Sequence, residues 1–182
     1  SDGVYCARSN AYNHIIGGIA GYVHGGDATF TNCTNQAALE SHMYNNNGIS
    51  NGTWEGMYTL PSVGGILGAF NYYPSSRESY TLKMQSCTNG KNLFSYRGHT
   101  GGIVGYCYNA TIDGCTNTGG QSNGTNDQCA IRGGIVGGAG NATVKNNVST
   151  GDITSKTYGS ADHANTGGIV GLVYGTDAVT VD

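Results

Sequence analysis

Apolar residues occur along this chain in short clusters that are separated by Gly, Asn, Asp and Ser. Short apolar clusters between turn-forming residues are typical of short β-strands. No long stretch shows the 3.6-residue period of an amphipathic helix, and apolar heptads do not occur. The pattern therefore predicts an all-β protein with many short strands.

A short glycine-rich string organises these clusters into a repeat. Gly-Gly-Ile-x-Gly occurs five times, and its successive starts are 47, 37, 32 and 34 residues apart. The last three intervals are close to one repeat length, so the first interval carries an insertion. The five copies begin at Gly17, Gly64, Gly101, Gly133 and Gly167.

Two further elements recur within the repeat. The sequence apolar-x-x-Cys-Thr-Asn follows the first three copies, and its degenerate fourth copy is expected to place Val148 near the Cys position. A third short element includes residues 92–94 and 152–154. Each repeat therefore holds two or three short strands. The second element spans residues 30–35, 84–89 and 112–117, and its degenerate copy spans residues 144–149.

Strands this short cannot bury an apolar face alone, whereas repeats stacked in register cover one another and align equivalent residues, such as the motif Ile, into ladders. The sequence therefore predicts a parallel β-helix, or β-solenoid, of about five repeats in a single domain over residues 1–182. Residues 1–16 and 167–182 are interpreted as incomplete repeats, and loop insertions are expected near residues 40–63 and 71–80. The motif glycines are expected to supply positive φ and close backbone approach at the corners.

The composition fits a narrow interior. Leu, Ile, Val and Phe make up about 17 % of the chain, and charged residues are 10 % where about 25 % is usual. The net charge of −3 argues against disorder and against a nucleic-acid-binding surface. No run of 18 apolar residues is present, so no membrane insertion is expected. Because the sequence begins at Ser1 without a basic and apolar leader, a mature secreted form or a fragment is expected.

The repeat resembles the GLUG motif, whose hallmark is Gly-Gly-(Leu/Ile)-Val-Gly. The last three copies match this hallmark, and residues 115–119 match the family's second half, Cys-Thr-Asn-x-Gly, in full. The copies at Cys33 and Cys87 lack the final Gly. Such repeats occur in secreted or surface-attached microbial proteins, including regions of immunoglobulin A peptidases and adhesin-like proteins. The resemblance implies a β-helical scaffold with a secreted or cell-surface location and transfers no catalytic residue.

Six cysteines, an even number, suggest an oxidising compartment, and the sequence leaves 15 disulfide connectivities open. Cys33, Cys87 and Cys115 occupy equivalent repeat positions, so on successive repeats they would lie about 5 Å apart, within disulfide reach. The alternative is a buried ladder of small apolar thiols. Cys107 and Cys129 lie outside this column and are the favoured bridge. The candidate disulfide residues are Cys6, Cys33, Cys87, Cys107, Cys115 and Cys129.

Six Asn-x-Ser/Thr sequons are candidate N-glycosylation sites. Asn109 and Asn141 each lie eight residues after a Gly-Gly start, at a predicted turn, and Asn32 and Asn147 are expected to face outward. The alternative, which we favour, is that these residues form turns, because Asn tolerates the left-handed backbone region. The six are Asn32, Asn51, Asn109, Asn123, Asn141 and Asn147.

No catalytic constellation is recognised, and neither enzyme activity nor a cofactor is predicted. Residues 48–52 match the Gly-x-Ser-x-Gly nucleophile-elbow string but lack its strand and helix, so a turn is expected. No Cys-x-x-Cys or paired His suggests a metal. Some β-solenoids cleave acidic polysaccharides with clustered Asp, and Asp27, Asp113 and Asp177 are the candidates, without an evident basic partner. The histidines expected to be solvated are His14, His24, His42, His99 and His163.

The loop insertions are better binding candidates than the repeats. Their aromatic rings are able to stack on sugar faces or to anchor a protein partner, or else to pack over the flank and cap an apolar edge. The candidate residues for glycan or partner binding are Trp54, Tyr58, Tyr72 and Tyr73.

Neither end of the chain shows an amphipathic cap, and the incomplete end repeats are suited to complement each other between chains, head to tail. The sequence thus favours a non-enzymatic extracellular structural or adhesive module that forms a surface filament, with itself or other surface proteins as partners. One alternative is a carbohydrate-binding module that uses loop aromatics. Another is a polysaccharide-cleaving β-helix enzyme.

Overall fold

The computed structural model describes residues 3–6, 14–42, 60–71, 80–123, 129–156, 163–174 and 178–182, without the side chains of Tyr5, Cys6, Cys129 and His163. These residues form strands and turns and include no helix, and every strand pairing among them is parallel. The predicted all-β class is confirmed, and the strands are mostly short.

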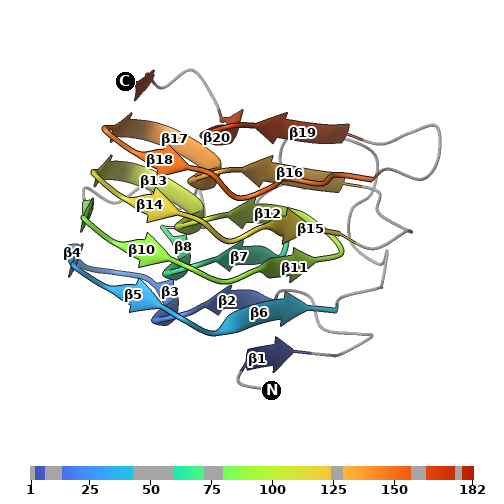
Figure 1. Ribbon diagram of the computed structural model, residues 1–182. Helices are drawn as coiled ribbons and strands as arrows, with labels where there is room; N and C mark the ends of the chain where they lie inside the picture. Colours follow the sequence, from blue (N-terminus) through green and yellow to red (C-terminus); the bar gives the residue numbers. More distant parts are fainter. Residues whose placement is uncertain are drawn as a thin grey trace.

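The strands form four sheets, here called A to D (Figure 1). Sheet A contains β1 (Gly3–Cys6), β6 (Ala38–Ser41), β11 (Leu93–Ser95) and β15 (Gln121–Ser122) in spatial order. Sheet B contains β2 (Ile15–Gly17), β7 (Ser62–Gly64), β12 (Gly98–Gly101), β16 (Cys129–Gly133) and β19 (His163–Gly167).

Sheet C is the largest, because its strands continue around a bend. Its main path contains β3 (Ala20–Val23), β8 (Leu67–Phe70), β13 (Val104–Asp113), β17 (Val136–Lys145) and β20 (Val170–Val173). The second halves of β13 and β17 also pair with β4 (Ala28–Thr31), β9 (Leu82–Gln85) and β21 (Val179–Val181), as β4–β9–β13 and β17–β21. Sheet D contains β5 (Thr34–Asn35), β10 (Thr88–Asn89), β14 (Thr116–Asn117) and β18 (Val148–Ser149).

The chain visits the sheets in the fixed order B, C, D and A, and one such passage is called a rung. Rung 1 contains β2 to β6, rung 2 contains β7 to β11, and rung 3 contains β12 to β15. Rung 4 contains β16 to β18 and reaches sheet A through a bridge between Ile153 and Gln121. Rung 5 contains β19 to β21, and β1 precedes rung 1 in sheet A. Figure 1 shows the rungs one above another, with β1 at one end and β19 near the other.

The motif isoleucines form the expected ladder through the core. Ile66, Ile103 and Ile135 are fully buried, whereas Ile19 of rung 1 is exposed and Ile169 of rung 5 is half-buried. The amide N–H of each motif Ile donates to the carbonyl of the motif Ile in the next rung, at 2.9 to 3.0 Å. Each rung therefore covers the apolar residues of its neighbour, and a narrow core suffices.

The motif glycines permit close packing, but the prediction that they adopt positive φ is wrong. The described glycines with positive φ lie outside the motif, for example Gly98 and Gly114. A Cβ on Gly101 would clash with the carbonyl oxygen of Val104 in its own rung, and a Cβ on Gly102 would clash with that of Gly134 in the next rung. These glycines are needed because backbone approaches backbone there.

A buried ladder of amide side chains runs through sheet D. Asn35 Nδ2 donates to Asn89 Oδ1, and Asn89 Nδ2 donates to Asn117 Oδ1, both at 2.8 Å. Each of the three Nδ2 groups also donates to a carbonyl two residues later in its own strand segment. The Asn of the Cys-Thr-Asn element is therefore an inward-facing residue whose polar atoms are satisfied within and between rungs.

Two of the histidines expected to be solvated are buried instead. His99 has no exposed surface and packs against Tyr106 and Tyr174, with ring centroids 5.3 and 5.4 Å away. Burial lowers the pKa of His99 to about 3, and it also lowers the pKa of His14. Tyr174, which is far from His99 along the chain, contributes to this environment, and spacing alone did not reveal it.

Candidate functional site

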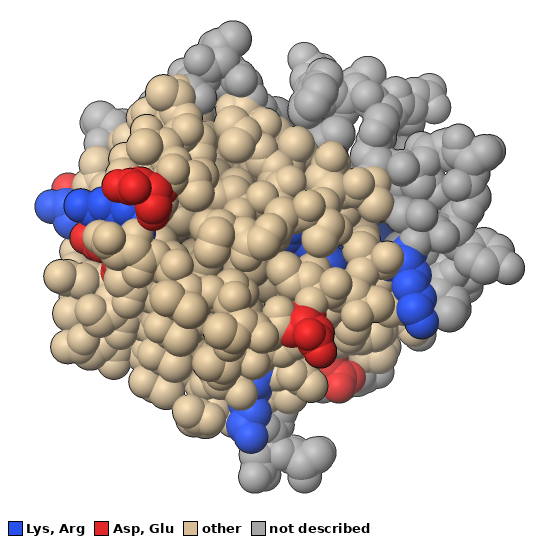
Figure 2. All heavy atoms as spheres, turned by 45° about the horizontal axis from the view of Figure 1, so that its top comes forward, with Lys and Arg blue, Asp and Glu red and all other residues tan. Residues whose placement is uncertain are grey.

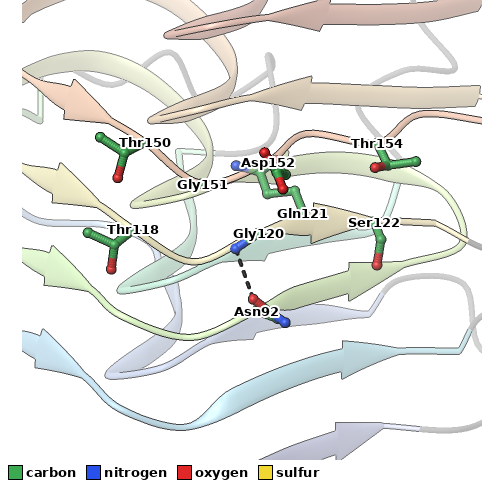
Figure 3. Close-up of a pocket in the computed structure, with 9 residues that line it drawn as sticks. All are labelled: Asn92, Thr118, Gly120, Gln121, Ser122, Thr150, Gly151, Asp152 and Thr154. Carbon is green, nitrogen blue, oxygen red and sulfur yellow. Dashed lines mark hydrogen bonds between the residues drawn. The ribbon is translucent and has the colours of Figure 1, made fainter.

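A polar groove opens on the outer side of sheets A and D, between rungs 2 and 4 (Figure 3). Its cavity volume is about 380 Å³. Gly120 and Gly151 have no side chains to fill the space, and Asn92 Oδ1 accepts a hydrogen bond of 2.9 Å from the Gly120 amide. Hydroxyl, amide and carboxylate groups surround this space. The lining residues are Asn92, Thr118, Gly120, Gln121, Ser122, Thr150, Gly151, Asp152 and Thr154.

An aromatic cluster lies beside this groove on the outer side of sheet A. Phe94 pairs in register with the groove residue Ser122 and lies 5.0 Å, between ring centroids, from both His42 and Tyr96. His42 Nε2 and Glu40 Oε2 are 2.9 Å apart. Sequence reasoning aligned residues 92–94 with residues 152–154 but missed both features. The signal that could have revealed both features is that alternate residues of these two short strands point outward from the sheet.

The cysteine column of rungs 1 to 3 exists as a ladder of thiols. Cys33, Cys87 and Cys115 are free in the structure, and each Sγ donates to the carbonyl two residues earlier, at 3.5 to 3.7 Å. A hydrogen bond between the thiols of Cys87 and Cys115 lowers the pKa of Cys87 and raises the pKa of Cys115. Burial raises the pKa of Cys115 further. Of the two readings of this column, the structure shows the buried ladder.

The favoured bridge to Cys107 is not formed. Cys107 is a free, fully buried thiol between Phe70 and Ala139 in the core of sheet C, and burial raises its pKa to about 12. The candidate disulfide residues Cys6 and Cys129 lie on described backbone, but their side chains are outside the described part. Among the cysteines whose side chains are described, none is cross-linked.

The degenerate fourth element aligns differently from the prediction. Val148 pairs with Thr116, so it faces outward and is exposed. Asn147 takes the cysteine position instead, because its Oδ1 accepts from the Cys115 amide at 2.8 Å and its Nδ2 donates to the Ile112 carbonyl at 2.9 Å. The expectation that Asn147 faces outward is therefore wrong, since its side chain fastens rung 4 to rung 3.

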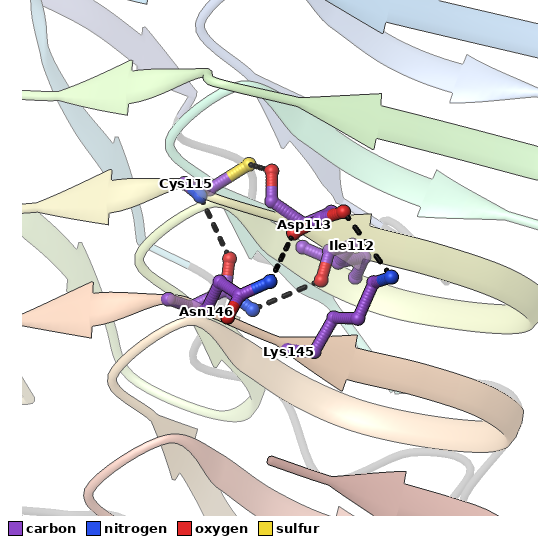
Figure 4. Close-up of polar contacts among 6 residues, drawn as sticks. Ile112, Asp113, Cys115, Lys145 and Asn146 are labelled. Atoms are coloured by element: carbon purple, nitrogen blue, oxygen red, sulfur yellow. Dashed lines mark hydrogen bonds and ion pairs between the residues drawn. The ribbon is translucent and has the colours of Figure 1, made fainter.

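The aspartates proposed for a polysaccharide-cleaving site do not come together. Asp27 caps Thr81 at the start of the β4–β9 pairing, with its Oδ1 2.7 Å from the Thr81 amide. Asp113 lies four residues further along the register, where Asn146 Nδ2 donates to it at 2.9 Å and Lys145 Nζ lies 3.4 Å away (Figure 4). The Asn146 hydrogen bond and, less strongly, Lys145 lower the pKa of Asp113. Asp177 lies outside the described residues.

The sequons divide into positions with positive φ and buried positions. Asn32, Asn109 and Asn141 all adopt positive φ, and Asn109 and Asn141 do so within strands β13 and β17 rather than in separate turns. Asn123 is buried, with its Nδ2 donating to the Lys156 carbonyl at 2.7 Å and its Oδ1 accepting from the Lys156 amide at 2.8 Å. Glycosylation at any of these sites stays a prediction, and Asn51 lies outside the described residues.

Several predicted sites fall where the structure gives no description. Residues 48–52 and the four loop aromatics belong to this group. The aromatics are Trp54, Tyr58, Tyr72 and Tyr73.

Charged side chains are sparse on the face drawn in Figure 2, where they form small separated groups. Within the described residues, no group of three or more His, Cys, Asp or Glu is arranged to hold a metal ion. A search of the same residues for a membrane-spanning helix finds none.

The two ends of the rung stack carry exposed apolar side chains. In the part of the chain that the structure describes, the large apolar side chains with 36 % to 52 % exposure all belong to end strands or the turns beside them. The free edges of β1 to β5 form the first end surface, and those of β18 to β21 with the Ile153 segment form the second. The exposed residues are Val4, Ile19 and Tyr22 at the first end and Val173 and Val181 at the second, together with Val148, which faces outward from the end strand β18.

Comparison with protein-family models, curated proteins and solved structures finds no match for this chain. The resemblance to the GLUG repeat therefore stays a prediction from the sequence.

Proposed function

We propose that this chain is a non-enzymatic structural module, a β-solenoid at or outside the cell surface, that assembles end to end through its two end surfaces. The observation that carries the proposal is that, among the described residues, the strongly exposed large apolar side chains lie on the end strands and the turns beside them. Unpaired parallel edges with apolar side chains favour the addition of further strands. A head-to-tail contact between two different surfaces of the same chain yields an open filament where its rotation does not close a ring.

Hydrogen-bond polarity supports stacking of the second end on the first end of another copy. Within the chain, the amide of Ile103 donates to Ile135, and the amide of Ile135 donates to Ile169, both at 2.9 Å. The same series starts at Ile19, which donates to Ile66 at 3.0 Å. A second copy continues the series when its Ile19 carbonyl accepts from Ile169. The free hydrogen-bonding groups at Ile169 of one copy and Ile19 of the next therefore complement each other, as those of successive rungs within the chain do.

Gly168 offers a specific argument for a further rung. The second Gly of each of the first four motif copies has no room for a Cβ, because the carbonyl of the next rung lies too close. Gly168 is the fifth such Gly, and a Cβ there would meet nothing within 4 Å. Its lack of a side chain serves no packing purpose within the described chain. Within the chain, the Gly168 carbonyl leaves no room for a Cβ on Gly134. If the Gly18 carbonyl of a second copy lay against Gly168 in the same way, Gly168 would have to be glycine for the same reason.

The decisive experiment compares the unmodified chain with Gly168→Ala by light scattering, sedimentation and negative-stain microscopy over a wide concentration range. We expect filaments or open oligomers from the unmodified chain and monomers from Gly168→Ala, whose thermal stability at low concentration is equal to or slightly above that of the unmodified chain. The matched control is Gly26→Ala, because a Cβ at Gly26 also meets no neighbour and Gly26 lies outside the Gly-Gly-Ile-x-Gly motif. Alanine tolerates the positive φ of 155° at this position poorly, so the folding of the control variant is verified first. A chain that stays monomeric at every concentration would refute the proposal.

Glycan binding is a second candidate function, and the groove beside Phe94 favours it. A space lined by hydroxyl, amide and carboxylate groups with an aromatic ring at its margin suits a neutral saccharide. The double variant Asn92→Ala plus Asp152→Ala, screened on a glycan array against Thr88→Ala, tests this candidate. Equal binding by both variants, or no binding by the unmodified chain, would exclude the groove as a glycan site.

A further inference from the structure

The two ends of the rung stack are stepped rather than flat, and this inference rests on the end-to-end assembly proposed above. At the first end, sheet A extends one strand beyond the other sheets, because β1 pairs with β6 while sheets B and C begin at β2 and β3. At the second end, sheets B and C extend one rung further, through β19, β20 and β21. Among the described residues, the last sheet A pairing at this end is the bridge between Gln121 and Ile153. Figure 1 shows β1 protruding below β6 at the N-terminal end.

The strand β1 has the register of the position that is open in rung 5. Val4 pairs with Leu39, Leu39 pairs with Leu93, and Leu93 pairs with Gln121, which bridges to Ile153. Val4 is thus the sheet A residue that would follow Ile153 by one further rung step. From this geometry we infer that β1 of one copy completes rung 5 of the preceding copy, next to β19, on the free edge of residues 152–154.

Burial along this column supports the match. Leu39 and Leu93 are fully buried between their neighbours, whereas Val4 is 46 % exposed and Ile153 is only half-buried. Stacking Val4 on Ile153 covers both apolar side chains at once, as each internal step of the column does. The partner copy therefore contributes a strand to a rung that the described chain does not complete, and the joint interlocks instead of meeting at two flat ends.

The interlocked joint fixes the geometry of the filament. The fifth rung of one copy is shared, so successive copies are related by five rung steps, or about 24 Å at the usual spacing of paired strands. Sheet D remains open over β18 at each joint, where Val148 is exposed. A flat-ended joint that excluded β1 from rung 5 would give a different axial repeat.

Native Cys6 allows a direct test of the register. Cys6 pairs with Ser41 in its own chain, and continuing the register places it over Ser155 of the preceding copy. Paired Cα atoms of neighbouring strands are close enough for a disulfide. Within one chain the same two positions are four rung steps apart, about 19 Å, so an intramolecular disulfide is excluded.

The experiment uses filaments of Ser155→Cys, oxidised with copper phenanthroline and mapped by mass spectrometry. We expect an intermolecular disulfide that joins position 6 to position 155, and its loss in the double variant Ser155→Cys plus Cys6→Ser. The matched control Thr154→Cys, whose position faces the opposite side of the strand, gives no such link. Filaments that form without the disulfide would overturn this inference while leaving end-to-end assembly intact.

A truncated chain without residues 1–6 provides a second test that does not depend on an introduced cysteine. We expect its threshold concentration for assembly to rise at least tenfold, because the sheet A contact is lost while the contacts of sheets B and C remain. An unchanged threshold and axial repeat would overturn the inference. A failure of the unmodified chain to assemble at all would instead refute the proposed function.

Discussion

Gly102 offers the sharpest test of how the rungs pack. A Cβ at this position would lie closer than 3.0 Å to the carbonyl oxygen of Gly134 in the next rung, and also closer than 3.0 Å to the side-chain amide of Asn117. Neither neighbour yields easily, since one is backbone and the other is held in the buried amide ladder. Gly102→Ala therefore has to separate rungs 3 and 4 or displace the ladder.

The expected cost follows from these two contacts. Overpacking typically destabilises by about 1–3 kcal/mol, and the rigid neighbours place this site at the upper end of that range. A hydrogen bond lost from the amide ladder adds about 1 kcal/mol. We expect the free energy of unfolding to fall by roughly 3–4 kcal/mol, which corresponds to a melting temperature about 6–16 °C lower for a chain of this length.

Urea and thermal unfolding, followed by far-ultraviolet circular dichroism at low protein concentration, measure the effect. Gly168→Ala is the matched control, because it is the equivalent glycine but has no neighbour within 4 Å of a Cβ. The control should be neutral, or up to about 1 kcal/mol more stable through its less flexible unfolded state. Equal losses in the two variants would refute the argument, since they would show that proximity to the next rung is not what requires glycine.

Three further predictions concern buried polar groups. Asn89→Ala should cost about 2–4 kcal/mol in urea unfolding, because it leaves buried partners in two neighbouring rungs without their hydrogen bonds; the outward-facing Thr88→Ala should cost under about 0.5 kcal/mol. His99 stays neutral when folded, since burial lowers its pKa to about 3, whereas the unfolded residue binds a proton below about pH 6.5. Stability should therefore fall as the pH drops from about 6.5 toward 3, by up to about 1.4 kcal/mol per unit, and a melting temperature that is constant between pH 6.5 and 4.5 would contradict this. The third prediction concerns thiol alkylation of the native protein at about pH 8, mapped by mass spectrometry. Half-buried Cys33 should react much faster than buried Cys107, because a pKa of about 12 leaves Cys107 almost no thiolate. Comparable rates for the two thiols would show that the core opens freely.

The sequence determined the repeat, and with it the strand content and the identity of the core ladder. Five copies of one short string fix which residues are equivalent, and equivalent residues of stacked short strands cover one another. The burial of Ile66, Ile103 and Ile135 follows from that rule alone. The same rule correctly predicted that the motif glycines serve close backbone approach, but the positive φ that was also predicted for them was wrong.

Only the tertiary structure decided which side chains meet between neighbouring rungs and where each sheet begins and ends. The fourth element shifts by one residue, because the Asn147 amide substitutes for a thiol by bonding to rung 3, and no pattern of apolar residues signals that exchange. The burial of His99 depends on Tyr174, which is 75 positions away in the chain. The stepped ends likewise arise from the rung at which each sheet begins and stops. Contacts between distant residues settle all three, and a one-dimensional pattern records only which positions are equivalent, not which side chains meet.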